Sequence, residues 1–309
     1  MPDRRRGSRH ADTVLIVSDV LTESVVPWLP EGHTLVVPGR GELFYRFHRH
    51  ADPDAPIAFL LHGWTASGDL QFFTAYHALA RHCSFITFDY RGHGRGLRLP
   101  HRFELEDVAD DAAALLEALG VAPVIAVGYS MGGPVAMLLT RRHPQLVRAI
   151  VMQATALEWC SSFLDRARWR TARIIGPLLR SFAYQRWLTI GIRRVLGKGH
   201  PLQGYVPWLS GEMRRNDPQS VVHAGQALSR YDARAWATEL RKPAASLITT
   251  EDRLVRPRKQ RALAEALGAD VRELTGDHLS AWVHPEEFAA ATVELVALVA
   301  AKSSAVALI

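Results

Sequence analysis

The chain has 309 residues, of which 48% are hydrophobic and 22% are charged, and its formal net charge is +6 at pH 7. This length and composition allow a sizeable core, and they exclude a disordered or fibrous protein in favour of one globular domain with a large insertion. The two cysteines, Cys83 and Cys160, stand far apart with no Cys/His cluster, which excludes a disulfide framework and a zinc site and favours a reducing compartment.

The first 30 residues show no sustained hydrophobic period, so we expect residues 1–30 to form an extension outside the core. The start of the chain is basic and then apolar, as in a secretory signal peptide. Because Asp12, Asp19 and Glu23 interrupt this run and leave its apolar part short, we predict a cytoplasmic protein instead.

Residues 31–156 alternate between short apolar runs and helical patterns. Two strands around the turn "GRG" come first, and from Ile57 onward apolar runs are separated by helices. The expected strands are "HTLVVPG", "ELFYRFH", "IAFLLH", "SFITFD", "PVIAVG" and "VRAIVMQ", and the expected helices are "ELEDVADDAAALLEALG" and stretches from about Asp69 and from Met131. Buried strands separated by helices predict an α/β fold, in which a mostly parallel central sheet carries helices on both faces.

Residues 157–238 interrupt this alternation, because they hold aromatic residues among many arginines and show no comparable strand signal. We predict that they form a helical cap inserted into the sheet domain. Residues 239–309 then complete that domain with the strands "AASLITT" and "DVREL", a helix from about Pro257 and a final helix after Pro285.

The final helix is apolar enough to resemble a membrane anchor. Glu294 and Lys302 divide it into pieces shorter than the ~20 residues that a membrane span needs. We therefore predict a closing helix that packs on the sheet.

A serine stands between a predicted strand and a predicted helix in the stretch "VIAVGYSMGGPV". Gly128, Ser130 and Gly132 form the pattern G-x-S-x-G, in which small residues on either side of the serine permit a sharp, strained turn. Such a turn presents the hydroxyl above the carboxyl end of the sheet, and the next helix directs backbone N–H groups at a negative oxygen formed there. A Gly-Ser turn without chemistry is the alternative for this motif taken alone.

A serine hydroxyl is a poor nucleophile at pH 7, so it needs a base that takes its proton and a carboxylate that orients the base. The stretch "LITTEDRLV" ends one strand with Glu251 and Asp252, and "LTGDHLSAW" ends the next with His278. Serine, then aspartate, then histidine is the chain order expected when the nucleophile occupies this kind of turn.

Five stretches, in this order along the chain, resemble the α/β-hydrolase superfamily, and the resemblance extends from about residue 33 to residue 301. The five are "LLHGW" (60–64), "FDYRGHGRG" (88–96), "GYSMGG" (128–133), "EDRLV" (251–255) and "GDHLSAWVHPEEF" (276–288). The resemblance implies the α/β-hydrolase fold, with residues 157–238 as a lid. It also implies a catalytic triad of Ser130, Asp252 and His278.

Within that resemblance the base is His278 rather than His284, and the acid is Asp252. The resemblance further implies that the backbone N–H groups of Met131 and Trp64 form an oxyanion hole. Each donor already directed at the developing negative charge can lower the barrier by about 3 to 4 kcal/mol. No cofactor or metal is expected, because "GHGRG" lacks the spacing of a phosphate-binding fingerprint and no set of metal ligands is spaced for coordination.

These residues predict a serine hydrolase of the esterase and lipase type, which cleaves a small-molecule carboxylic ester through an acyl-enzyme on Ser130. The aromatic residues of the cap favour an apolar acyl group, since burial gains about 0.8 kcal/mol per methylene, or else they form the core of the cap itself. The arginines of the cap form a solvated face, or they approach an anionic membrane surface or an acidic substrate group, and we expect no nucleic-acid partner. The alternatives are a perhydrolase or cofactor-free haloperoxidase, an acyltransferase, and a non-catalytic ligand-binding protein of this fold.

Overall fold

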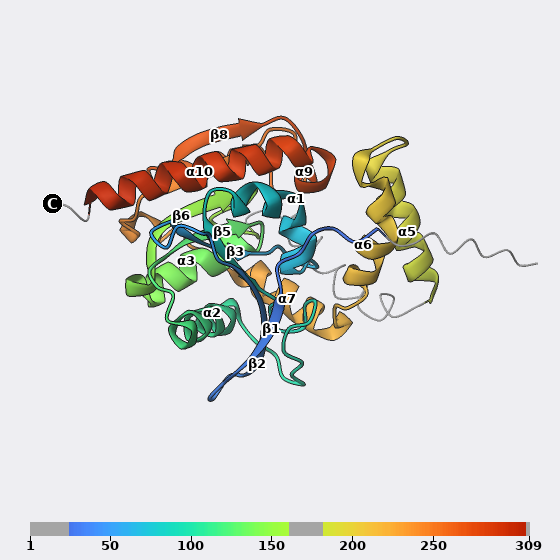
Figure 1. Cartoon of the computed structure of the whole chain (residues 1–309), viewed down its shortest axis with the longest axis horizontal. Helices are drawn as coiled ribbons and strands as arrows, with labels where there is room; N and C mark the ends of the chain where they lie inside the picture. The colour runs from blue at the N-terminus through green and yellow to red at the C-terminus, as the bar shows by residue number, and fades with distance from the viewer. Residues whose placement is uncertain (1–24, 161–181, 307–309) are drawn as a thin grey trace, which may run out of the picture.

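An eight-stranded sheet forms the centre of the computed structural model, which describes residues 25–160 and 182–306 (Figure 1). The strands lie in the order β1-β2-β4-β3-β5-β6-β7-β8, and only the pairs β1/β2 and β2/β4 are antiparallel. Their bounds are β1 (Gly32–Val37), β2 (Gly41–His48), β3 (Ile57–Leu61), β4 (Ser84–Phe88), β5 (Val124–Tyr129), β6 (Val147–Gln153), β7 (Ala244–Thr249) and β8 (Asp270–Leu274). The mostly parallel sheet predicted from the alternating pattern is confirmed.

Helices cover both faces of this sheet, as the alternation also predicted. The α-helices are α1 (Gly68–Ala80), α2 (Leu105–Leu119), α3 (Gly132–Arg142), α5 (Phe182–Leu196), α6 (Val206–Met213), α7 (Pro218–Arg230), α8 (Pro257–Ala266), α9 (Ser280–Val283) and α10 (Pro285–Val306), and the short 3-10 helices are η1 (Pro144–Leu146), η3 (Pro201–Tyr205) and η4 (Ala237–Glu239). Figure 1 shows α1 and α10 together on one side of the strands and α2 and α3 on the other.

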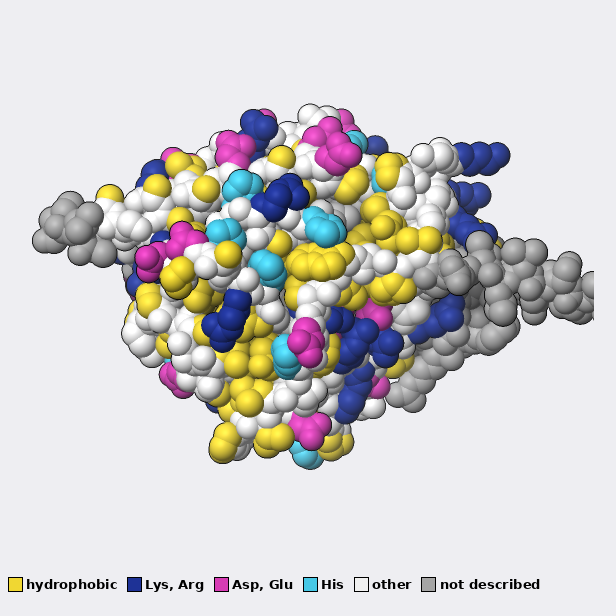
Figure 2. Space-filling model, viewed as in Figure 1, with side chains coloured by type: hydrophobic (Ala, Val, Ile, Leu, Met, Phe, Trp, Pro, Cys, Tyr) yellow, Lys and Arg dark blue, Asp and Glu magenta, His cyan; other side chains and the backbone are white. Residues whose placement is uncertain are grey.

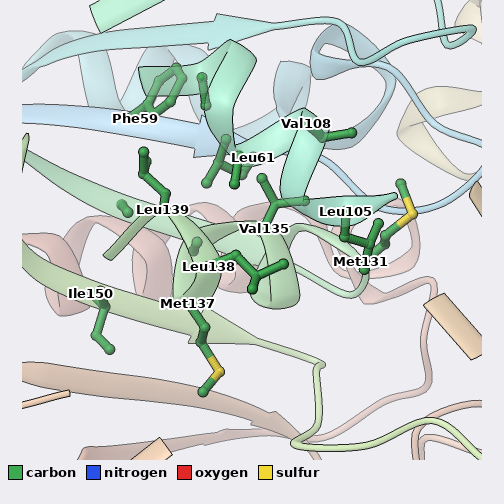
Figure 3. Close-up of a cluster of buried hydrophobic side chains, with 14 of the residues drawn as sticks. Phe59, Leu61, Leu105, Val108, Met131, Val135, Met137, Leu138, Leu139 and Ile150 are labelled. Carbon is green, nitrogen blue, oxygen red and sulfur yellow. The ribbon is translucent and has the colours of Figure 1, made fainter. Parts of the chain in front are cut away.

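Strand β3 shows how the apolar runs build the core. Phe59 and Leu61 enter the hydrophobic cluster on the side of α2 and α3, which Figure 3 shows, whereas Ala58 and Leu60 enter the cluster on the side of α1 and α10. All four side chains are fully buried, and burying a residue of leucine size stabilises the fold by about 1.5 to 3 kcal/mol. A strand buried on both faces must be apolar throughout, which is the pattern seen in the sequence.

Helix α10 is long and apolar enough over Pro285–Ala305 to cross a membrane, judged by length and composition alone. Its Phe288 and Leu295 are buried in the cluster beneath α1, and Thr292 accepts a hydrogen bond of 2.9 Å from the side chain of Gln153 in β6. The helix therefore packs on the sheet, as predicted.

Residues 157–238, which we call the cap segment, contribute α5, α6 and α7 after strand β6. Helices α5 and α6 lie beyond one edge of the sheet, at the right of Figure 1. Within the extension predicted at the N-terminus, residues 25–30 are described, and there Trp28 stacks on His77 of α1 with ring centroids 4.6 Å apart.

Candidate active site

Ser130 occupies the turn between β5 and α3 with a backbone φ of 53°, in the left-handed region that a non-glycine residue rarely adopts. Such a conformation costs on the order of 1 to 3 kcal/mol and persists only where neighbours hold it. The Ser130 N–H donates to the carbonyl of Gln153 over 2.9 Å, and its carbonyl accepts from the Thr155 hydroxyl over 2.7 Å. Strand β6 thus fixes the backbone that presents the hydroxyl.

The two glycines that flank this serine are required by close approach. A Cβ atom on Gly128 would lie 2.3 Å from the Gly132 carbonyl oxygen, and one on Gly132 would lie 1.9 Å from the Leu61 carbonyl oxygen. The small residues permit the sharp turn, as predicted, because the strand and the helix meet with no room for a side chain at either position.

The three side chains expected to act together lie within hydrogen-bond distance of one another. The Ser130 hydroxyl oxygen is 2.9 Å from Nε2 of His278, and Nδ1 of the same ring is 2.7 Å from Oδ2 of Asp252. The backbone carbonyl of His278 accepts a hydrogen bond of 2.9 Å from the hydroxyl of Tyr129. Glu251, the neighbouring acid, is exposed to solvent.

Asp252 is 2% exposed and accepts four hydrogen bonds besides the one from the imidazole. Its Oδ1 receives the backbone N–H groups of Leu254 and Val255, both at 2.8 Å. Its Oδ2 receives the Thr249 hydroxyl at 3.0 Å and the Gln260 side-chain amide at 3.2 Å. These donors fix the carboxylate in the orientation that the histidine ring meets, and charge-assisted bonds of this kind are strong.

Gln260 and Thr249 were not identified from the sequence. Gln260 lies eight residues after the acid in helix α8 and is 1% exposed, and it binds Thr249 through both ends of its amide. The local signal would have been a polar residue on the buried side of α8, next to Leu263 and Ala264. A glutamine in a charged helix carries no such signal by itself.

Both positions predicted to supply oxyanion donors lie beside Ser130. Met131 follows it at the start of α3, and Trp64 follows Gly63, where an added Cβ would lie 3.3 Å from the Ser130 Cβ. The side-chain oxygen of Gln71 accepts from the Gly63 N–H over 3.4 Å, so this loop is held against the serine.

His62 and His93 are fully buried and hold the backbone of nearby loops. Nε2 of His62 accepts from the Tyr90 N–H over 3.1 Å, and its Nδ1 donates to the Gly63 carbonyl over 2.8 Å. Burial lowers the pKa of His62 well below its usual value, and burial likewise lowers the pKa of His93 to about 4. Both rings are therefore neutral at pH 7, and neither reaches Ser130.

A cavity of about 640 Å³ opens above Ser130 and His278. Its apolar walls come from the cap segment and from loops of the sheet domain, and include Trp159, Leu188, Ile192, Leu228, Leu254 and Trp282. Of the described residues, the charged side chains that also line it are Glu158, Arg256, Arg258 and Lys259. The volume is in the range that holds a small organic molecule.

The cap segment is joined to the loop that carries Trp64. The Trp64 indole N–H donates to the Val221 carbonyl in α7 over 2.7 Å. Asn216 donates from its amide to the Thr65 carbonyl over 2.7 Å and accepts from the Gly94 N–H over 2.8 Å. Asn216 was not identified from the sequence, since its partners are more than a hundred residues away along the chain.

The stretch "GHGRG" makes one of these contacts with the cap segment. The Gly92 carbonyl accepts from the Asp217 N–H over 2.7 Å, and a Cβ on Gly92 would lie 1.9 Å from the Cβ of Ser220. This glycine permits close packing of its loop against helix α7. Among the described residues, no group of three or more His, Cys, Asp or Glu side chains stands close enough to hold a metal ion.

Known proteins resemble this chain in sequence and in fold. Residues 57–171 match the family model of the alpha/beta hydrolase fold. The pimeloyl-[acyl-carrier protein] methyl ester esterase of Chromobacterium violaceum is 29% identical over 218 residues, which span 69% of this chain and 82% of that protein. A bifunctional esterase/perhydrolase of Acinetobacter calcoaceticus is 33% identical over 103 residues, 33% of this chain and 37% of that protein.

Solved structures resemble the fold over most of the chain. The enol-lactonase from Burkholderia xenovorans superposes with a TM-score of 0.73 at 21% sequence identity, and the match covers 86% of this chain and all of that one. At this level of identity the likeness concerns the fold.

Proposed function

The chain has the α/β-hydrolase fold and matches the model of that family, and from this premise we propose that it hydrolyses a carboxylic ester through an acyl-enzyme on Ser130. The observation that carries the proposal is the continuous hydrogen-bonded path from the Ser130 hydroxyl through His278 to Asp252, at the base of the 640 Å³ cavity. The alternative of a non-catalytic ligand-binding protein is set aside, because the relatives are named as enzymes.

In the first half of the reaction, Nε2 of His278 takes the proton of the Ser130 hydroxyl while the oxygen attacks the ester carbonyl carbon. Backbone N–H groups of Met131 and Trp64 stabilise the negative charge on the carbonyl oxygen. The tetrahedral intermediate collapses, Nε2 gives its proton to the leaving alkoxide, and the alcohol departs. Asp252 keeps the Nδ1 proton of the ring in place throughout.

In the second half, a water molecule attacks the acyl carbon of the acyl-enzyme. His278 takes one proton of the water and returns it to the Ser130 oxygen as the carboxylic acid is released. The buried, strained position of Ser130 supports this role, because a hydroxyl already in line with its base loses little entropy on reaction.

The substrate in this proposal is a small molecule with an apolar acyl group. The walls that Trp159, Ile192 and Trp282 provide support it, because each methylene they bury contributes about 0.8 kcal/mol. A cytoplasmic location fits the cysteines, since Cys83 and Cys160 are both free thiols. Lys and Arg side chains project along the edge that α5 occupies (Figure 2), and they support weak contact with an anionic membrane surface.

The proposal is tested with a fluorophosphonate probe and p-nitrophenyl esters. Ser130→Ala and His278→Ala are each expected to lower kcat by about four orders of magnitude or more, and the double variant to be scarcely worse, since the residues act as a unit. The probe is expected to label the wild-type protein and not Ser130→Ala. Near-normal turnover by purified Ser130→Ala would refute the mechanism.

A second candidate differs only in the acceptor of the acyl group. The relative from Acinetobacter calcoaceticus is named an esterase/perhydrolase, and this name supports hydrogen peroxide as an acyl acceptor in place of water. Attack by peroxide on the same acyl-enzyme releases a peracid, and attack by an alcohol releases a new ester. Product analysis with each acceptor present distinguishes these outcomes from simple hydrolysis.

A further inference from the structure

Among the described residues that line the active-site cavity, positively charged side chains outnumber acidic ones. Lys259 and Glu158 form an ion pair with 2.9 Å between Nζ and Oε2, and both side chains are largely buried. Arg256 and Arg258 also line the cavity, and within the described part of the chain neither of them pairs with an acidic side chain. Two positive charges therefore stand uncompensated at a cavity whose other walls are mostly apolar.

The position of these arginines makes them costly to the fold. They occupy the N-cap and the second residue of helix α8, and the first turn of that helix holds no acidic residue. Cations at the start of a helix oppose its dipole, and acidic side chains are the ones that stabilise this end. Both arginines are exposed to solvent. A residue choice that destabilises its own helix is expected at sites where the residue binds a ligand.

The acid loop fixes where the two guanidinium groups begin. Oδ1 of Asp252 holds the backbone of Leu254 and Val255, which directly precede Arg256 and also line the cavity. The residue that orients the base and the two arginines are thus parts of one short segment beside the reaction centre. Ser130 and both arginines line the same cavity.

We propose that Arg256 and Arg258 select esters that carry a carboxylate or another anionic group away from the scissile bond. This proposal rests on the ester hydrolysis proposed above and specifies its substrate. The apolar walls bind the hydrocarbon part of such a molecule, and the guanidinium groups bind its charged end by charge-assisted hydrogen bonds.

The test compares esters that differ only by the charge. In the first pair, monoethyl adipate carries a carboxylate on its acyl part and ethyl hexanoate is its neutral counterpart. In the second pair, the butyrate ester of ω-hydroxyhexanoate carries a carboxylate on its alcohol part and hexyl butyrate is the neutral counterpart. Wild-type kcat/KM is expected to be about three- to thirtyfold higher for the anionic member of at least one pair, as two exposed charge pairs would give. The pair that shows it identifies the end of the substrate that faces the arginines.

The variants distinguish an effect of Arg256 and Arg258 from an effect of the net positive charge of the whole protein. Arg256→Gln combined with Arg258→Gln is expected to bring the ratio of the two kcat/KM values close to one, and the double change to glutamate to reverse it. Arg261→Gln is the matched control, because Arg261 lies on the same helix, pairs with Glu273 and does not line the cavity, so the ratio is expected to persist. Added salt is expected to lower the wild-type ratio.

The outcomes also separate this inference from the proposed function. Hydrolysis of neutral esters with no preference for either anionic ester, or a preference that survives in the double glutamine variant, overturns the role of the arginines alone. Failure to hydrolyse any ester or to react with the fluorophosphonate overturns the proposed function as well. Binding to the Ser130→Ala protein, followed by quenching of tryptophan fluorescence from Trp159 and Trp282, gives a readout without turnover and is expected to show the same preference.

Discussion

Gln260 connects the acid of the active site to the helix that follows it. Its amide donates to Asp252, to the Thr249 hydroxyl and to the Val255 carbonyl, at 2.7 to 3.2 Å, and its oxygen accepts from the Thr249 N–H. One buried side chain thus holds both the strand end and the loop that carries the carboxylate. Partners of this kind orient reacting groups, and their loss commonly costs ten- to a hundredfold in activity, about 1.4 to 2.8 kcal/mol.

Gln260→Glu is expected to lower kcat/KM by about tenfold or more and to move the acid limb of its pH profile upward. A second carboxylate beside Asp252 favours the imidazolium form of His278, so the base becomes available only at higher pH. Gln260→Met, which removes the hydrogen bonds without adding charge, is expected to lose activity with the limb unmoved. Equal pH profiles for the two variants would contradict this account.

Asp252→Asn is expected to lower turnover by roughly four orders of magnitude while the melting temperature changes little, because an amide favours the wrong imidazole tautomer. Glu251→Gln is the matched control. Its side chain is exposed, so its activity is expected to stay near wild type. If the control proves the more damaging change, the acid has been assigned to the wrong member of the pair.

Ser130, Asp252 and His278 could be predicted because each stands at a strand end in a recognisable local pattern. Thr249, Gln260 and Asn216 could not. Their roles depend on which side of a helix or loop faces a segment distant in the chain, and a polar side chain gives no local sign of that. Packing alone decides it.

At the scale of elements, the cap segment contributes walls to the cavity above Ser130. Trp159 is 9% exposed and lines the cavity, whereas Phe163, another aromatic residue of the cap segment, lies outside the described residues. Trp159→Ala is expected to change the preferred acyl chain length more than the turnover of an acetate ester, since a small acyl group needs little of this wall. Uniform losses across the ester series, with a lower melting temperature, would show that Trp159 serves the core of the cap segment.

The contact between the "GHGRG" loop and α7 offers a sharper test of how the cap segment is seated. Gly92 has a φ of +72°, and an added Cβ would overlap the Cβ of Ser220. Gly92→Ala is expected to destabilise the protein by about 1 to 3 kcal/mol and to reduce ester turnover, measured by urea unfolding and kinetics.

Ser220→Gly removes the atoms that the new methyl group would meet, so the double variant is expected to recover part of both losses. The backbone strain at Gly92 remains in the double variant, and recovery is therefore incomplete. If Ser220→Gly restores nothing, the loss came from the backbone conformation and not from the contact with α7.

At the scale of the whole molecule, the buried groups His93 and Asp89 make the free energy of unfolding depend on pH in opposite directions. The pKa of His93 is about 4 in the folded protein and near 6.5 when unfolded, so its contribution is complete above about pH 6.5 and is lost as the pH falls through 4. Burial, reinforced by Asp69, raises the pKa of Asp89 to about 7, so its contribution is present below about pH 4 and is lost as the pH rises through 7. Between these limits the two effects partly cancel.

His93→Gln removes the pH-dependent contribution of His93 to the free energy of unfolding. The gain in unfolding free energy between pH 4.5 and pH 7 is expected to be smaller than in wild type, by up to about 3 kcal/mol for a shift of this size. Urea unfolding at the two pH values measures it. His284→Gln is the control, because that ring is partly exposed and pairs only with the exposed Glu287, and an equal effect there would contradict the assignment to burial.

The fold class could be predicted from the sequence, whereas the strand order and the contacts between distant segments could not. Runs such as "IAFLL" and "SFITF" predicted buried parallel strands because both faces of each strand had to be apolar. The strand order and the contacts of the cap segment with the loops at Trp64 and Gly92 could not be read from such runs. The contacts of the cap segment join residues more than a hundred positions apart, and no local periodicity records either the strand order or these contacts.

The hydrogen bond from the Trp64 indole to the Val221 carbonyl has a consequence for how the enzyme admits its substrate. The same residue whose backbone we assign to the oxyanion hole is fastened by its side chain to α7. We therefore expect a displacement of α7 to disturb the position of this backbone donor as well. On this assignment, the seating of α7 and the assembly of the reaction centre are coupled.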